Sequence, residues 1–170
     1  MGKPPILSIV GFKNAGKTTL TERLVRELVG RGLRVSTIKH AHHAFDIDHE
    51  GRDSWRHRQA GAQQVAVVSG ARIAFVEELR GRPEPSLDAI IERMEPCDLL
   101  ITEGYKWEKH PKIEVRNLAD QQPELAGNDP TVIALAASGP IAAPVPVFDR
   151  EDAQGLADFI ESHFSLRLQG

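Results

Sequence analysis

The sequence contains a single cysteine, Cys97, among 170 residues, so no disulfide can form within the chain. Low cysteine content is typical of a reducing compartment. No apolar run approaches the roughly 18 residues that a membrane-spanning helix requires, and the short apolar stretch near the N-terminus lacks the pattern of a secretory signal peptide. We therefore expect a cytoplasmic protein that does not enter a membrane.

An excess of positive charge is also missing. With 21 Lys and Arg against 24 Asp and Glu, the formal net charge is −3, so no surplus of cations exists to neutralise a nucleic-acid backbone. Binding to nucleic acid is therefore not expected. Hydrophobic residues make up 41% of the chain and charged residues 26%, a composition typical of a globular domain. We interpret residues 1–170 as a single domain, because this length fits one domain.

The most informative motif is the segment GFKNAGKT at residues 11–18, which matches the phosphate-binding loop G-x-x-x-x-G-K-[ST]. An apolar run at residues 6–10 precedes it and a helix-periodic segment follows, so the motif lies between a predicted strand and a predicted helix. Glycines let backbone N–H groups approach phosphate oxygens, and a helix N-terminus favours an anion. Lys17 is expected to reach the β- and γ-phosphates and Thr18 to offer its hydroxyl to Mg²⁺. We therefore expect residues 1–170 to form a single P-loop nucleotide-binding domain. The predicted nucleotide-binding residues are Gly11, Asn14, Ala15, Gly16, Lys17, Thr18 and Thr19.

Apolar runs alternate with helix-periodic segments along the rest of the chain. We expect strands near residues 34–39, 98–103, 113–116, 131–137 and 145–148, and helices near residues 54–60, 87–94 and 152–164. Two further runs, residues 64–69 and 71–76, flank a tight turn and predict a β-hairpin. The pattern predicts an α/β fold of the P-loop NTPase class, with a mainly parallel sheet flanked by helices and a β-hairpin extension.

A second acidic group is needed near the phosphate loop to hold Mg²⁺ or its water shell. The strand at residues 98–103 offers Asp98 at its start and Glu103 at its end. Ligands bind beyond the carboxyl ends of parallel strands, so Glu103 is favoured over Asp98 as a metal ligand. A surface position at a strand end is the alternative interpretation.

Residues 40–49 are rich in histidine and aspartate and permit three interpretations. They could bind zinc or another transition metal, supply Asp46 or Asp48 to the magnesium–phosphate cluster, or form a solvated polar loop. The second is favoured, because the loop follows the second predicted strand and the sole cysteine lies elsewhere. Lys39 and His40, at the end of that strand, are further candidates to face the ligand.

A basic stretch follows this loop. Arg52, Arg56 and Arg58, with His57, could bind an anionic ligand or imitate the arginine-rich lid of a kinase. A solvated helix face explains the same residues without any ligand.

Further segments extend the pattern beyond the phosphate loop. They are residues 37–43 (TIKHAHH), 45–48 (FDID), 51–54 (GRDS), 58–62 (RQAGA), 103–106 (EGYK), 111–115 (PKIEV) and 155–160 (GLADFI). Together with the loop, they resemble the MobB family of molybdopterin-guanine dinucleotide biosynthesis adapter proteins across most of the chain. The resemblance implies a homodimer that binds GTP and Mg²⁺, hydrolyses GTP weakly, and assists the molybdopterin guanylyltransferase that attaches GMP to molybdopterin. By position, it assigns Lys17 and Thr18 to phosphate and magnesium and places Asp46 and Glu103 near the metal.

The sequence departs from the family at one point. Members tend to carry an Ala-Ser-Asp pattern after an Ala-rich strand, where the carboxylate could accept from the guanine amino group. Here Ser138 is followed by Gly139. Asp149, after the next apolar run, is a further candidate to face the base.

Two other functions use the same loop. A nucleoside or small-molecule kinase would act alone, but it needs a base for its acceptor hydroxyl, and the sequence offers no obvious acceptor site. A metallochaperone would carry a metal on the histidine loop and gate its release with the phosphate loop. An adapter that is a weak GTPase at most is the favoured interpretation.

Overall fold

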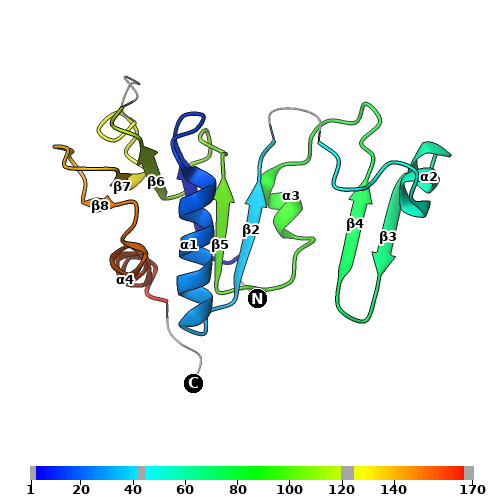
Figure 1. Ribbon diagram of the computed structural model, residues 1–170, viewed down its shortest axis with the longest axis horizontal. Helices are drawn as coiled ribbons and strands as arrows, with labels where there is room; N and C mark the ends of the chain where they lie inside the picture. The colour runs from blue at the N-terminus through cyan, green and yellow to red at the C-terminus, as the bar shows by residue number, and fades with distance from the viewer. Residues whose placement is uncertain (1–2, 42–44, 120–124, 167–170) are drawn as a thin grey trace. The chain divides into compact units, whose positions relative to one another are not determined.

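The computed structural model describes residues 3–41, 45–119 and 125–166. They form two compact units, one from Met1–His40 with Glu95–Gly170 and one from Ala41–Met94 (Figure 1). We call the first the sheet unit and the second the hairpin unit, and each is described by itself. The expectation of one nucleotide-binding domain over residues 1–170 stays a prediction.

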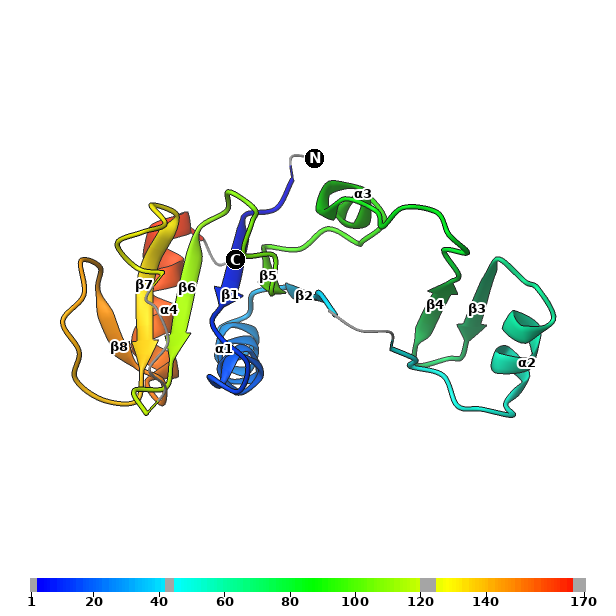
Figure 2. The ribbon, with the colours of Figure 1, turned by 90° about the horizontal axis from the view of Figure 1, so that it is seen from above.

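A six-stranded sheet forms the centre of the sheet unit. Its strands are β1 (Ile6–Val10), β2 (Val35–Lys39), β5 (Leu99–Glu103), β6 (Lys112–Arg116), β7 (Val132–Ala137) and β8 (Val147–Asp149). They lie in the order β2-β5-β1-β6-β7-β8, and all their pairings are parallel (Figure 2). The carboxyl ends of all six strands therefore meet at one edge of the sheet, where ligands of open parallel sheets bind.

Two helices, α1 (Lys17–Gly30) and α4 (Ala153–Phe164), pack against this sheet and against each other. Leu20, Leu24 and Leu28 of α1 recur at helical spacing and are at most 1% exposed, so they form the apolar stripe that a helix on a sheet must bury. The α4 helix begins at Asp152, whose side chain accepts a hydrogen bond from the Gly155 N–H, an N-cap of the usual kind. The core fixes α1, and with it the loop that precedes α1.

The central strands carry polar as well as apolar buried residues. Every residue of β1 is buried, as expected of a strand covered on both faces. The Ser8 and Thr102 hydroxyls, on neighbouring strands, satisfy each other across 2.8 Å. Pairing the two hydroxyls removes the penalty of burying either one alone.

The hairpin unit contains the predicted antiparallel pair, β3 (Gln64–Val68) and β4 (Ile73–Glu77), with α2 (Asp53–Gln59) and α3 (Leu87–Ile91). The Ser86 side chain accepts from the Ala89 N–H and begins α3. The predicted helix at residues 87–94 ends at Ile91, because the following residues switch to the tighter i→i−3 bonds, from Arg93 N to Ile90 O and from Met94 N to Ile91 O.

The predicted fold class is confirmed: a parallel sheet flanked by helices, with a β-hairpin extension. Among the residues that the structure describes, no helix has the length and apolar character to cross a membrane.

Candidate nucleotide-binding site

The loop at residues 11–16 joins β1 to α1 at the carboxyl edge of the sheet. Gly11 has φ +146°, and a Cβ there would lie 2.5 Å from the Val115 carbonyl oxygen. Gly16, with φ +102° in the left-handed region, precedes the first residue of α1. Both glycines of the motif are therefore required sterically, because no side chain fits at Gly11 and L-residues rarely adopt the Gly16 conformation.

Lys17 turns back onto the start of the same loop. Its Nζ donates to the Gly11 carbonyl at 3.0 Å and to the Phe12 carbonyl at 2.7 Å. Burial lowers the pKa of Lys17 from its ordinary 10.5, Glu103 opposes that shift, and Lys39 adds to it. The ammonium is thus held beside the loop by carbonyl groups, which leave its charge uncompensated.

Thr18 and Glu103 meet at the end of β5. The Thr18 hydroxyl lies 2.9 Å and 3.1 Å from the two Glu103 carboxylate oxygens. Lys39, at the end of β2, places its Nζ 3.1 Å from Glu103 Oε1 and 3.5 Å from Thr18 Oγ1. We call Lys17, Thr18, Lys39 and Glu103 the loop cluster.

The donor set of the loop cluster fits Mg²⁺. This ion takes oxygen ligands, keeps several waters, and is usually held by one or two protein groups together with substrate phosphates. A hydroxyl and a carboxylate side by side next to a phosphate loop provide that arrangement. Thr18 and Glu103 are therefore the residues that would hold the ion.

Asp98 lies at the other end of β5, as its place in the sequence predicts. Its carboxylate accepts from the Arg34 backbone N–H at 2.7 Å and from Arg34 Nη2 at 2.6 Å. Arg34 holds the pKa of Asp98 below its ordinary value of 3.8. Asp98 ties two strand starts together and is remote from the loop.

Two further predicted ligand-facing residues lie at the carboxyl edge of the sheet. His40 follows β2, and its ring is 5.0 Å from the Tyr105 ring. Asp149 ends β8, is exposed, and accepts from the Glu151 N–H at 2.8 Å. The role of Asp149 in base recognition stays a prediction.

Arg150 is a residue beside the loop that the sequence analysis missed. It follows β8, and its Nη1 donates to the Ala15 carbonyl at 3.0 Å. The rule that favoured Glu103 could have found it, because Arg150 also comes directly after a parallel strand.

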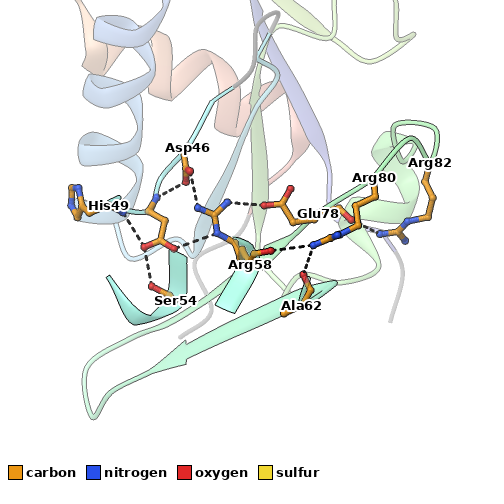
Figure 3. Close-up of polar contacts among 9 residues, drawn as sticks. Asp46, His49, Ser54, Arg58, Ala62, Glu78, Arg80 and Arg82 are labelled. Atoms are coloured by element: carbon orange, nitrogen blue, oxygen red, sulfur yellow. Dashed lines mark hydrogen bonds and ion pairs between the residues drawn. The ribbon is translucent and has the colours of Figure 1, made fainter. Parts of the chain in front are cut away.

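The predicted metal ligand Asp46 and its neighbour Asp48 belong to the hairpin unit, where both bind Arg58 (Figure 3). Arg58 Nη2 lies 2.7 Å from Asp46, Nε 3.3 Å from Asp48, and Nη1 2.7 Å from Glu78. We call these four residues the Arg58 cluster. Hydrogen bonding from Arg58 is the largest cause that lowers the pKa of Asp46 from 3.8. The expected magnesium role of Asp46 and Asp48 stays a prediction.

The expectation of a basic patch at residues 52–58 is wrong for Arg58. Its side chain is only 7% exposed and all three of its guanidinium nitrogens are bonded to carboxylates, so it cannot act as a mobile lid arginine. Arg52, at the start of α2, is exposed. Arg56 and His57 instead line an open cavity of about 510 Å³ along α2 with Trp55.

Within residues 3–41, 45–119 and 125–166, no group of three or more His, Cys, Asp or Glu side chains is placed to hold a metal ion. His42 and His43, central to the zinc and metallochaperone interpretations, lie outside the described residues.

The glycine loop joins the first strand of a parallel sheet to the first helix, which begins with Lys and Thr. This arrangement defines the class of protein: the chain has a P-loop NTPase-like fold. The family model of molybdopterin guanine dinucleotide synthesis protein B, MobB, matches residues 6–138. The chain belongs to the MobB family, and this membership supports a role in molybdenum-cofactor biosynthesis.

Sequence similarity to two curated relatives extends over nearly the whole chain. It is 39% identical over 161 residues to a molybdopterin-guanine dinucleotide biosynthesis adapter protein of Haemophilus influenzae, covering 93% of this chain and 88% of that one. The Escherichia coli protein of the same name is 39% identical, with 92% and 91% covered. Among solved structures, one of molybdopterin-guanine biosynthesis protein B is 30% identical, covers 94% of this chain and 99% of its own, and superposes with a TM-score of 0.73. A MobB structure from Bacillus subtilis is 28% identical, with 93% and 96% covered and a TM-score of 0.72.

Proposed function

We propose that this chain is a GTP-binding adapter that assists the guanylyltransferase attaching GMP to molybdopterin. The observation that carries the proposal is the loop cluster, in which two ammonium groups, a hydroxyl and a carboxylate surround a phosphate loop. Two positive charges against one negative charge favour a polyphosphate anion. The relatives named as biosynthesis adapters supply the metabolic context.

In this proposal, the loop N–H groups and Lys17 bind the phosphates, while Thr18 and Glu103 hold Mg²⁺. When bound there, Mg²⁺ would supply positive charge that offsets the charge of the phosphates. The site is built for binding, so we expect GTP turnover by the isolated protein well below the roughly 1–100 s⁻¹ of typical kinases.

The proposal extends to a cytoplasmic homodimer, the state implied by the family resemblance. Light scattering on the purified chain tests the oligomeric state independently of nucleotide.

Titration with GTP, ATP, GDP and ADP in Mg²⁺ tests the function. We expect GTP to bind most tightly, and we expect the protein to raise the output of molybdopterin guanine dinucleotide when added to the guanylyltransferase. Lys17→Ala should remove that stimulation. Arg26→Ala should not, because it deletes a cation from the exposed face of α1, where the side chain is 74% exposed. Phosphorylation of a small acceptor by the chain alone, or stimulation that survives Lys17→Ala, would refute the adapter function.

A further inference from the structure

Arg150 connects the far edge of the sheet to the phosphate loop. It follows β8, the edge strand, whereas the loop follows β1 near the centre, and β6 and β7 lie between them. Its guanidinium nevertheless reaches the loop, with Nη1 3.0 Å from the Ala15 carbonyl oxygen. A Cβ at Gly16 would come within 3.0 Å of the same nitrogen. The second glycine of the motif therefore leaves room for this arginine.

The backbone of Arg150 is held on several sides. Its N–H donates to the Ala137 carbonyl at 3.1 Å, and its carbonyl accepts from Arg23 Nη1 at 3.2 Å. Arg23 also pairs with Glu151 at 2.6 Å. Because Arg23 lies on α1, these bonds connect the turn after β8 to the helix that follows the phosphate loop. The backbone of Arg150 and the phosphate loop are thus both bonded to the same part of the sheet unit.

The bond to Ala15 has a geometric consequence. In a trans peptide, the carbonyl of one residue and the N–H of the next lie in one plane and point in opposite directions. Holding the Ala15 oxygen on Arg150 therefore turns the Gly16 N–H away from the arginine. Gly16 precedes α1, and the first N–H groups of a helix have no partner within that helix.

We infer that Arg150 is a positioning residue of the phosphate loop: by holding the Ala15 carbonyl, it aims the Gly16 N–H at the bound phosphate. This inference rests on the proposed nucleotide function. Arg150 Nε is buried without a hydrogen-bond partner among the described residues. The guanidinium therefore keeps donor capacity and positive charge at the back of the loop.

The test compares GDP and GTP binding to Arg150→Ala, Arg150→Lys, Lys17→Ala and the matched control Arg26→Ala, all checked for folding by circular dichroism. Backbone contacts of the loop are shared by di- and triphosphates, so Arg150→Ala should weaken both ligands by the same factor, about tenfold. Arg150→Lys, which keeps a charged donor, should lose less, and Arg26→Ala nothing. The Gly16 amide resonance of the nucleotide-free protein should shift in Arg150→Ala and stay in place in Arg26→Ala.

Each contrary result has a distinct meaning. Unchanged affinity in Arg150→Ala, with Lys17→Ala weakened, overturns the inference and leaves the proposed function standing. A loss confined to GTP also overturns it, because it would indicate direct contact with the terminal phosphate. Unchanged affinity in Lys17→Ala removes the proposed function itself.

Discussion

The loop cluster and the Arg58 cluster are built from the same kinds of side chain in opposite proportions. The loop cluster has Lys17 and Lys39 against Glu103. The Arg58 cluster has a single cation, only 7% exposed, whose three nitrogens are bonded to three carboxylates. Three carboxylates against one buried cation give the Arg58 cluster a net negative charge, which disfavours an anionic ligand. The loop cluster keeps uncompensated positive charge, so it can attract an anion.

Surplus negative charge in the Arg58 cluster is relieved in other ways. Asp48 also accepts from the Ser54 hydroxyl and the His49 N–H, both at 2.9 Å. Asp46 and Glu78 reach solvent, with 44% and 35% of their side chains exposed. Arg80 adds bonds at 3.2 Å to the carbonyls of Arg58 and Ala62 (Figure 3). The cluster connects residues 46–48, α2 and the end of β4, so we expect it to stabilise the hairpin unit.

The largest expected effect is that of Gly11→Ala on the loop. The added methyl would meet a backbone carbonyl at 2.5 Å, which cannot move without displacing β6. We expect nucleotide affinity to fall by at least about a hundredfold, about 2.7 kcal/mol, in calorimetric titrations. Gly70→Ala is the control, because nothing lies within 4 Å of a Cβ there. Normal binding by Gly11→Ala would mean that the loop is not the site.

Arg58→Met should damage the hairpin unit and spare the loop. Removing the cation leaves three carboxylates facing each other, so the backbone amides of β3 and β4 should lose protection in hydrogen exchange, and a melting transition should fall by more than about 5 °C. Arg93→Met is the matched control, since Arg93 also pairs with a carboxylate of this unit but is 61% exposed. Equal effects of the two variants would show that burial of Arg58 adds nothing.

A comparison of Asp46→Asn with Glu78→Gln separates the structural role of Asp46 from its predicted magnesium role. Each substitution removes one of the negative charges that face Arg58, so both should lower the stability of the hairpin unit to a similar extent. If Asp46 also serves the metal, Asp46→Asn alone should weaken nucleotide binding in Mg²⁺, by about tenfold, and change little in EDTA. Parallel behaviour of the two variants in Mg²⁺ would assign Asp46 to the Arg58 cluster only. A fall in melting temperature of the parent protein on adding EDTA without nucleotide would instead indicate a structural metal.

The smallest effect concerns pH. Because the pKa of Lys17 lies below 10.5, the free protein loses this charge at lower pH than an ordinary lysine does. Phosphate binding needs the charged form, so affinity should decline as pH rises through that lowered pKa, starting below pH 10.5. Lys17→Arg, whose guanidinium does not titrate there, should show a smaller decline than the parent protein. Identical profiles for the two proteins would contradict a phosphate role for Lys17.

The elements of the fold follow from local patterns in the sequence. Apolar periodicity predicts each strand and helix within a few residues, since the core stripe of α1 and the buried strands leave direct signatures. The polar pairs leave no such signature in the sequence. Ser8 meets Thr102 and Arg150 meets Ala15 only because distant strands become neighbours, and Arg58 looks like one more exposed arginine until its three carboxylates are in place.

For the site, position relative to the strands was the useful signal. Placement at a strand end predicts that Glu103 lies beside Thr18 and that Asp98 lies at the opposite end, as the structure has them. Arg150 also follows a parallel strand, but the residues around it match no phosphate-binding motif, so the sequence does not single it out. The strands β6 and β7 lie between β8 and β1 in the sheet, so strand order alone does not predict the contact of Arg150 with Ala15.

The most direct test of the contrast is a crossed measurement of Lys17→Ala and Arg58→Met, with nucleotide affinity in EDTA and hydrogen exchange of β3 and β4 recorded for both. Lys17→Ala should weaken GTP binding by at least about tenfold, about 1.4 kcal/mol, and leave exchange unchanged. Arg58→Met should speed exchange and leave affinity unchanged. Loss of affinity in Arg58→Met, or full affinity in Lys17→Ala, would contradict the assignment of binding to one cluster and structure to the other.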